Sequence, residues 1–247
     1  NFLYFSKHLL KIMTKNLVII PTYNEKENIE KMLRKVFSLP EEFHVLIVDD
    51  GSPDGTADIV KSLQSNFPNK LFIEERKGKL GLGTAYIHGF KWALKNGYEF
   101  IFEMDCDFSH NPEDLIRLLD ACENKGADFA IGSRYCRGGK VKNWPVGRIM
   151  MSYFASVYVR MVLWINVKDT TAGFKCYKRK VLETIDKIKF VGYAFQIEMK
   201  YKAIKMGFKA KEVPITFIDR QEGVSKMSGS IFKEAFYGVL KMRFGKV

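Results

Sequence analysis

The sequence predicts a single α/β domain in which a mostly parallel sheet carries helices on both faces. Short, continuously apolar segments alternate with amphipathic segments of helical spacing, which is typical of a buried parallel sheet. The 247 residues are 47% hydrophobic, enough for one large core. The sequence contains no internal repeat, low-complexity tract or flexible linker. We therefore expect one α/β unit, with disorder confined to its two ends.

Each strand–helix unit begins with an apolar run and continues into a charged, amphipathic segment. Asn24 is expected to cap the first helix, and Pro112 to open the fourth. In chain order we expect a strand at 16–21, a helix at 25–37, a strand at 44–50, a helix at 54–66, a strand at 71–75, a helix at 83–95, a strand at 100–105, the Pro112 helix, and strands at 127–133 and 212–218.

Polar clusters stand where three of these strands end. They read PTYNE (21–25), DDGSPDG (49–55) and DCDFSH (105–110). In open α/β sheets, ligands bind beyond the carboxyl ends of the strands. The functional site is therefore expected at this edge of the sheet.

The second cluster begins with two adjacent carboxylates, Asp49 and Asp50. Neighbouring side chains at a strand end point to opposite sides, so one carboxylate can meet a nucleobase or ribose while the other faces away. Asp54, in the following Gly-Ser-Pro-Asp-Gly turn, is interpreted as a structural capping residue.

The third cluster is an Asp-x-Asp sequence, Asp105-Cys106-Asp107. Alternate side chains of a strand share one face, so both carboxylates can approach one hard cation. Mg²⁺ or Mn²⁺ would bridge them to a diphosphate. An Asp-x-Asp sequence is common by chance, but its occurrence together with the other two clusters at strand ends favours a functional metal site.

A glycine-rich segment at 77–89, KGKLGLGTAYIHG, opens a helix and resembles a dinucleotide-binding fingerprint. A basic insert of five residues separates its first glycine from the preceding strand, whereas the fingerprint requires the glycine turn directly after the strand. A helix entry near phosphates suits a sugar-diphosphate donor equally well.

Arg148 and Ser152 lie one helical turn apart at the start of the apolar segment 149–165, and together can cradle a phosphate. The apolar segment fits either a buried core helix or an interfacial helix that guides a lipid tail. The basic, amphipathic tail at 226–247 likewise fits either a segment that covers the core or a segment that binds a membrane. The polar loop from Asp219 to Lys226 is expected to close over a diphosphate.

The net charge of +12 favours an anionic partner, namely nucleic acid, an anionic membrane surface or a phosphorylated substrate. No nucleic-acid module accompanies the charge, so we expect no nucleic-acid partner. The well-separated cysteines fit a reducing cytosol, and no apolar stretch reaches the roughly 20 residues of a membrane span. Met13 is expected to be the natural start. The four histidines show no ligand spacing and are interpreted as non-catalytic.

Taken together, these motifs resemble the polyprenol-phosphate (dolichol-phosphate) mannosyltransferases of the family-2 glycosyltransferases. The resemblance runs from about Leu17 to about Ser230. It is carried by PTYNE, VDDGSPDGT, GLGTAYIHG, MDCDFSHNP, GSRY, DTTAGFK, VPITF and DRQEGVSK. It implies a GT-A (nucleotide-diphospho-sugar transferase) fold at 16–230, after an N-terminal extension at 1–15 and before a C-terminal amphipathic segment at 231–247.

The resemblance also implies roles for individual residues. Asp107, Arg134, Asp169 and Arg220 would form the catalytic set, with Asp169 lining the sugar site. Asp105, Asp107 and Ser109 would hold the metal and diphosphate, and Arg148 with Ser152 the acceptor phosphate. The substrate-binding set would be Pro21, Tyr23, Glu25, Val48, Asp50, Asp105, Cys106, Asp107, Arg134, Arg148, Ser152, Arg220 and Lys226.

The activity so implied is transfer of mannose from GDP-mannose to a polyprenyl monophosphate, with inversion, at the cytoplasmic face of a membrane. A membrane-anchor partner subunit is compatible with the resemblance. Cys106, Ala172 and Lys175 stand where alanine, serine and arginine are frequent in the family. The alternatives are a UDP-sugar donor, such as UDP-glucose, and a non-catalytic nucleotide-binding protein at the membrane surface.

Overall fold

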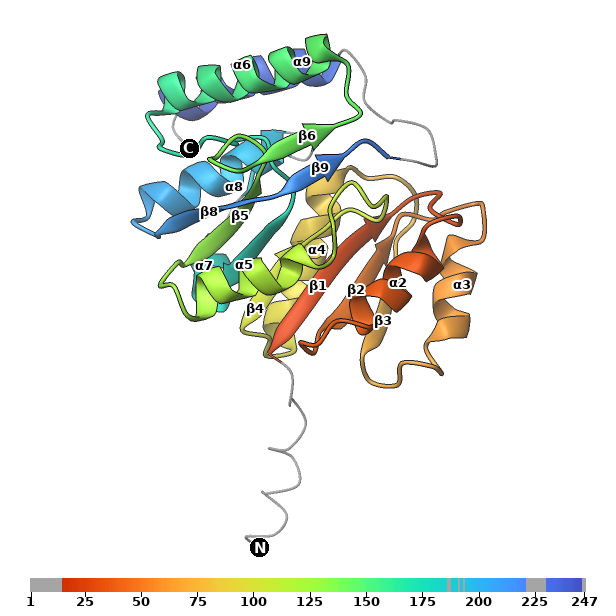
Figure 1. Cartoon of the computed structure of the whole chain (residues 1–247). Coiled ribbons are helices and arrows are strands. Elements are labelled where there is room, and N and C mark those ends of the chain that lie inside the picture. The colour runs from red at the N-terminus through yellow and green to blue at the C-terminus, as the bar shows by residue number, and fades with distance from the viewer. Residues whose placement is uncertain (1–14, 186–187, 191, 193, 221–229, 246–247) are drawn as a thin grey trace, which may run out of the picture.

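The computed structural model describes residues 15–185, 188–190, 192, 194–220 and 230–245. At its centre lies a seven-stranded sheet of order β3-β2-β1-β4-β7-β5-β8 (Figure 1). β7 is antiparallel to β4 and β5, and the other neighbours are parallel, which confirms a mostly parallel sheet. The strands are β1 (Asn16–Thr22), β2 (His44–Asp49), β3 (Leu71–Glu75), β4 (Phe100–Glu103), β5 (Phe129–Ser133), β7 (Lys175–Lys178) and β8 (Ala210–Pro214).

Helices cover both faces of this sheet, as expected. One face packs against α2, α3 and α5 through a core that includes Met32, Val60 and Leu118. The opposite face packs against α4, α7 and α8 through a core that includes Tyr86 and Phe195. These helices are α2 (Ile29–Phe37), α3 (Thr56–Leu63), α4 (Leu82–Lys95), α5 (Asp114–Glu123), α7 (Arg179–Thr184) and α8 (Ala194–Lys205).

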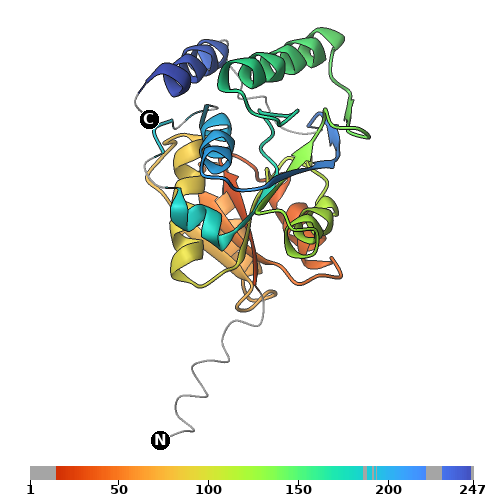
Figure 2. The same cartoon turned by 90° about the vertical axis from the view of Figure 1, so that its left-hand side faces the viewer.

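Two further helices, α6 (Val146–Leu163) and α9 (Ser230–Phe244), lie side by side outside these layers (Figures 1 and 2). A small separate core joins them to α8 and includes Leu163, Ile197 and Met242. By length and composition alone, α6 is long and apolar enough to cross a membrane. Its exposed apolar residues show that α6 is not a buried core helix: Val146, Met150, Met151, Tyr153, Phe154 and Met161.

Most expected element boundaries shift by a few residues, for example at the helix expected to open at Pro112, which begins at Asp114, and two expectations are wrong for reasons that the backbone shows. Asn24 does not cap the first helix, because its φ of 55° places it in a left-handed turn, and the helix begins only at Ile29, after Asn28. The strand expected at 212–218 is two strands, β8 and β9 (Thr216–Ile218), which separate at Ile215. The sequence analysis did not predict β7 or α8. The order of the strands in the sheet also could not be predicted from local sequence patterns.

Ile215 connects the large sheet to a second, two-stranded sheet of β6 (Lys140–Lys142) and β9. Its amide donates to the carbonyl of Ser133 in the large sheet at 3.1 Å, and its carbonyl accepts from the amide of Lys140 at 2.9 Å. β9 therefore leaves the large sheet and passes over the carboxyl ends of its strands. This departure brings Phe217 and Asp219 to the edge where the polar clusters lie.

Candidate active site

The Asp-x-Asp carboxylates lie just beyond the end of β4. Arg220 contacts Asp107 with 3.0 Å between Nη2 and Oδ2, and the Tyr86 hydroxyl points at Asp105 Oδ1 from 3.5 Å. Desolvation by the surrounding protein and the nearby charge of Asp107 raise the pKa of Asp105 to about 7. Solvent reaches 39% of the Asp105 side chain, which moderates that shift. The pair is thus a site of unfavourable negative charge that favours a cation.

Two other residues of this motif, Cys106 and Ser109, differ in which of their atoms a ligand can reach. Cys106 is 3% exposed and its side chain packs in the core beneath the sheet, so a substrate can meet only its backbone. The buried Ser109 donates its amide to Asp107 Oδ1 at 3.1 Å. Its place beside Asp107 is compatible with the expected role near the metal, which stays a prediction.

His110 lies behind the carboxylate pair. Its ring stacks on Phe174 with centroids 4.9 Å apart and contacts the edge of the Phe217 ring at 5.4 Å. Burial lowers the pKa of His110 to about 4, so the ring is neutral at physiological pH. The amide of Asp105 donates to its Nδ1 at 3.4 Å. His110 therefore touches the backbone of the carboxylate motif, a contact that motif spacing did not indicate.

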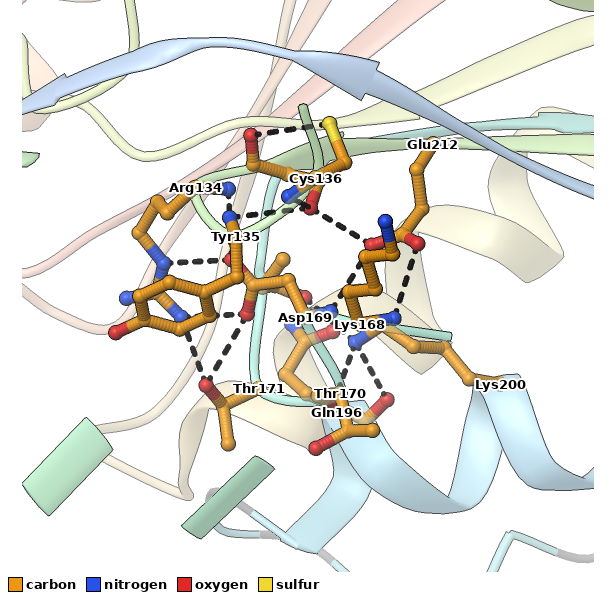
Figure 3. Close-up of polar contacts among 12 residues, drawn as sticks. Arg134, Tyr135, Cys136, Lys168, Asp169, Thr170, Thr171, Gln196, Lys200 and Glu212 are labelled. Carbon is orange, nitrogen blue, oxygen red and sulfur yellow. Dashed lines mark hydrogen bonds and ion pairs between the residues drawn. The ribbon is translucent and has the colours of Figure 1, made fainter. Parts of the chain in front are cut away.

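Arg134 and Asp169 form a buried ion pair at the end of β5 (Figure 3). Arg134 donates to Asp169 through its amide at 2.9 Å, Nε at 2.7 Å and Nη2 at 2.7 Å, and Nη2 also donates to the Thr171 hydroxyl at 2.7 Å. Burial alone would raise the pKa of Asp169, but Arg134 lowers it below its usual value. Two residues expected in the catalytic set thus form a bidentate ion pair.

A second carboxylate, Glu212 on β8, holds the main chain around this pair (Figure 3). Its Oε1 accepts from the amide of Asp169 at 2.9 Å and from the Ser133 hydroxyl at 2.7 Å. Its Oε2 accepts from the amide of Lys168 at 2.9 Å. Glu212 therefore holds Asp169 and the residue that precedes Arg134, and sequence reasoning missed it.

The clusters after β1 and β2 lie at the same edge of the sheet. Asp49 accepts from the hydroxyls of Thr22 and Ser52, whereas Asp50 pairs with Arg76 through Nε at 2.7 Å. The two neighbouring carboxylates thus have separate partners, as expected for a strand end. Arg76, from the basic segment after β3, was missed because its pairing with Asp50 is not a local feature.

The remaining residues expected at the nucleotide end lie along these strand ends. Tyr23 carries Lys79 over its ring at 5.3 Å, and the amide of Glu25 donates to Thr56 Oγ1 at 3.0 Å. Pro21 pairs in register with Val48 between β1 and β2. Val48 is fully buried in the core, so only its main chain can meet a nucleotide.

Asp54 plays the structural role expected of it. Its Oδ1 accepts from the Thr56 amide at 3.0 Å and its Oδ2 from the Lys26 amide at 3.0 Å. It therefore ties the start of α3 to the loop after β1, although Gly55 rather than Asp54 precedes the helix.

The expected acceptor residues lie at the start of α6. Arg148 donates to both carboxylate oxygens of Asp219, at 3.2 and 3.3 Å, and lies 4.0 Å above the ring of Trp144. Ser152 follows Arg148 by one helical turn. The Trp144 ring also lies 5.6 Å from the guanidinium carbon of Arg134. One aromatic ring, absent from the expected set, thus lies close to both arginines.

Lys226, the last expected substrate ligand, lies outside the described residues. Asp219 and Arg220, which precede it, are described and point to different ends of the site, since Asp219 pairs with Arg148 and Arg220 with Asp107. A cavity of about 740 Å³ opens beside Asp107, bounded by α2, α5 and the β8–β9 connection. Among the described residues, no group of three or more His, Cys, Asp or Glu side chains could hold a metal alone.

Comparison with known proteins identifies the family. Residues 17–186 match the family model described as glycosyl transferase family 2. The chain belongs to this family. It is therefore a glycosyltransferase, an enzyme that transfers a sugar.

Two curated relatives resemble this glycosyltransferase over nearly its whole length. Polyprenol monophosphomannose synthase of Mycolicibacterium smegmatis is 49% identical over 227 residues, which cover 91% of this chain and 85% of the relative. Undecaprenyl-phosphate mannosyltransferase of Micrococcus luteus is 45% identical over 227 residues, covering 91% and 92%.

Solved structures with the same fold are more distant in sequence. A glucosyl-3-phosphoglycerate synthase from Mycobacterium tuberculosis superposes with a TM-score of 0.70 at 15% identity, covering 94% of this chain and 81% of that one. A mannosyltransferase from Pyrobaculum calidifontis, solved with GDP-Man and Mn²⁺, gives 0.62 at 18% identity, covering 99% and 70%. These similarities confirm the GT-A fold expected from the sequence.

Proposed function

We propose that this glycosyltransferase transfers mannose from GDP-mannose to a polyprenyl monophosphate, releasing GDP. The observation that carries the proposal is the 45–49% identity, over 91% of the chain, to two enzymes named for mannosyl transfer to polyprenyl phosphates. The separate groupings around Asp107, Arg134 and Arg148 support it, because the reaction brings together a donor diphosphate, a sugar and an acceptor phosphate.

Asp105 and Asp107 would hold a Mg²⁺ or Mn²⁺ ion, with Ser109 beside them and diphosphate oxygens completing the shell. The carboxylate pair fits this role, because burial and the neighbouring charge of Asp107 raise the pKa of Asp105 and a guanidinium already contacts Asp107. When bound, the metal would neutralise charge on the leaving diphosphate. Arg220, 3.0 Å from Asp107, is near enough to share that task.

The acceptor phosphate oxygen would attack the anomeric carbon of mannose as the bond from that carbon to the diphosphate breaks, which inverts the configuration to β. A phosphate monoester is anionic at neutral pH, so the reaction needs no general base. The neutral His110 and the absence of histidine from the Arg134 and Arg148 groupings agree with this. Arg148 and Ser152 would orient the acceptor phosphate, and Arg134 and Asp169 the sugar end of the donor.

The α6–α9 layer supports a membrane location for the acceptor. Exposed large apolar side chains gather on these two helices: Met150, Met151, Phe154, Met161 and Trp164 on or just after α6, and Phe236, Tyr237 and Phe244 on α9. Arg148 lies at the start of α6, so the proposed acceptor site would be at one end of this layer. We propose that the layer lies on a membrane surface and delivers the lipid phosphate to Arg148.

The decisive experiment offers the purified chain a panel of labelled GDP- and UDP-sugars with polyprenyl phosphates and Mn²⁺ or Mg²⁺, and identifies the lipid product. We expect a β-linked mannosyl phospholipid from GDP-mannose, and none without metal. Transfer only from UDP-glucose would replace mannose in the proposal. Binding without transfer from any donor would favour a nucleotide-binding protein at the membrane surface.

A further inference from the structure

Lys200, on α8, is a fully buried cation with no solvent exposure. Its ammonium group donates to the carbonyls of Thr170 at 3.0 Å, Ala172 at 2.7 Å and Gln196 at 3.0 Å (Figure 3). An ammonium group has three donors, so each of them is used. All three acceptors are neutral main-chain carbonyls.

Stability alone gives a poor account of a lysine at this position. Burial, with repulsion from Lys175, lowers the pKa of Lys200 well below its usual value, which means that the surroundings disfavour the charge. A buried charge is in general no more stabilising than a well-packed apolar side chain of similar volume. A methionine would fill similar space without the desolvation cost. Lys200 therefore calls for a role that depends on its hydrogen bonds.

The two carbonyls outside α8 belong to the turn that holds Arg134. They flank Thr171, whose hydroxyl accepts from Arg134, and they follow Asp169, whose carboxylate accepts from Arg134 three times. The third carbonyl, of Gln196, is also placed to accept the ordinary helical hydrogen bond within α8. Lys200 thus fastens the turn at 169–172 to α8 at two points around the residues that grip Arg134.

We propose that Lys200 is a positioning residue for the sugar end of the donor site. It fixes the turn at 169–172, so that Asp169 and Thr171 present their oxygens to Arg134 in one arrangement. Lys200 touches neither Arg134 nor the expected substrate positions, so it acts through the turn. The inference rests on the proposed function for the identity of the donor and for the place of Arg134 and Asp169 at its sugar end.

The test replaces Lys200 with methionine in the full chain, with Lys205→Met, an exposed position on the same helix, as the matched control. We expect Lys200→Met to lower kcat/KM about 10- to 100-fold, with a raised KM for GDP-mannose, because misplacement of a group at a distance has effects of this size. Lys205→Met is expected to leave both constants unchanged. A loss of folded protein alone would lower kcat without changing KM.

A double variant tests whether the effect passes through the turn. If it does, adding Lys200→Met to Asp169→Asn causes little further loss, because the contact that Lys200 maintains is already broken. The inference would be overturned if the losses of kcat/KM in the two single variants add in full in the double variant. It would also be overturned if the Lys200→Met enzyme has the wild-type KM and the wild-type kcat per folded molecule.

Hydrogen exchange gives a readout that needs no substrate. The amide of Arg134 donates to Asp169 and the amide of Asp169 to Glu212, so both should exchange faster in Lys200→Met and at the wild-type rate in Lys205→Met. If Lys200→Met fails to fold, Lys200→Gln, which keeps an amide donor, replaces it. Unchanged exchange in the folded variant would contradict the inference, whereas a wild-type enzyme inactive with GDP-mannose would contradict the proposed function instead.

Discussion

The Arg134–Asp169 pair at the sugar end has side chains 8% and 0% exposed, whereas the Arg148–Asp219 pair at the acceptor end is 29% and 31% exposed. The first pair has side-chain bonds of 2.7 Å, and its carboxylate also accepts from the Arg134 amide, while the amide of Asp169 donates to Glu212. The second has contacts of 3.2 and 3.3 Å. The donor end is therefore preorganised by burial, and the acceptor end is an open surface pair that can exchange its partner at small cost.

This difference matches the two substrates proposed for the enzyme. A nucleotide sugar presents the same rigid groups at every turnover, which suits a buried, multiply bonded arrangement. In the proposed reaction, a lipid phosphate would arrive from the α6–α9 layer, and Arg148 would release Asp219 to bind it. If the comparison is right, changes at the donor end should reduce catalysis strongly, and changes at the acceptor end should reduce acceptor binding more mildly.

Removal of a carboxylate at the donor end should have the largest effect. Asp107→Ala removes the partner of Arg220 and one of two groups expected to hold the metal, so transfer should fall by at least about 10³-fold. Steady-state assays with saturating Mn²⁺ measure the loss, and Asp58→Ala, on the exposed face of α3, is the control. Activity above a tenth of wild type in the folded Asp107→Ala enzyme would refute the metal assignment.

Arg134→Lys should have the next largest effect. Lysine offers a compact charge in place of the planar fork that contacts Asp169 and Thr171, so the buried carboxylate loses part of its pairing. We expect kcat/KM to fall about 100-fold, together with a lower melting temperature. Arg137→Lys, an exposed neighbour, is the control. A variant with wild-type kinetics would show that the buried pair does not act at the donor end.

Local sequence patterns anticipated much of the fold and the placement of the site. Strand runs such as LFIEE and the acidic clusters at three strand ends depend on neighbours along the chain, so the expected strand at 71–75 matches β3 residue for residue. Asn24 failed as a cap because the same side chain that suits a helix start also tolerates the left-handed turn it adopts. The strand expected at 212–218 is divided at Ile215, because the amide and the carbonyl of Ile215 form hydrogen bonds with different sheets. The periodicity of the sequence does not indicate such a division.

Three of the site residues that were missed have partners far away in the chain. Arg76 meets Asp50, Glu212 meets the amide of Asp169, and Lys200 meets the turn at 169–172. Each reads locally as a charged residue of ordinary surface type, and only the packing of distant segments buries it. Motif reasoning therefore finds the groups expected to contact substrates more readily than the groups that hold them in place.

At the acceptor end, Arg148→Ala should raise the KM for polyprenyl phosphate about tenfold, the usual worth of one hydrogen bond to a charged group. The KM for GDP-mannose should stay at its wild-type value, because Arg134 and Asp169 do not depend on Arg148. Two-substrate kinetics separate these constants, with Arg137→Ala as the control. An equal rise in both values would break the proposed division between donor and acceptor ends.

The smallest effect should come from the apolar face of α6. Phe154 is 59% exposed, and Phe154→Asp replaces a ring available for insertion into lipid with a charge. With acceptor embedded in anionic vesicles, kcat/KM should fall about fivefold, equivalent to about 1 kcal/mol of lost apolar insertion. With a short-chain acceptor in solution it should not change, since Phe154 lies beyond the residues expected to bind phosphate. Met206→Asp, an exposed methionine just beyond α8, is the matched control for an added charge. Equal losses with both acceptors would mean that Phe154 supports the site itself and that the α6–α9 face is not where the lipid enters.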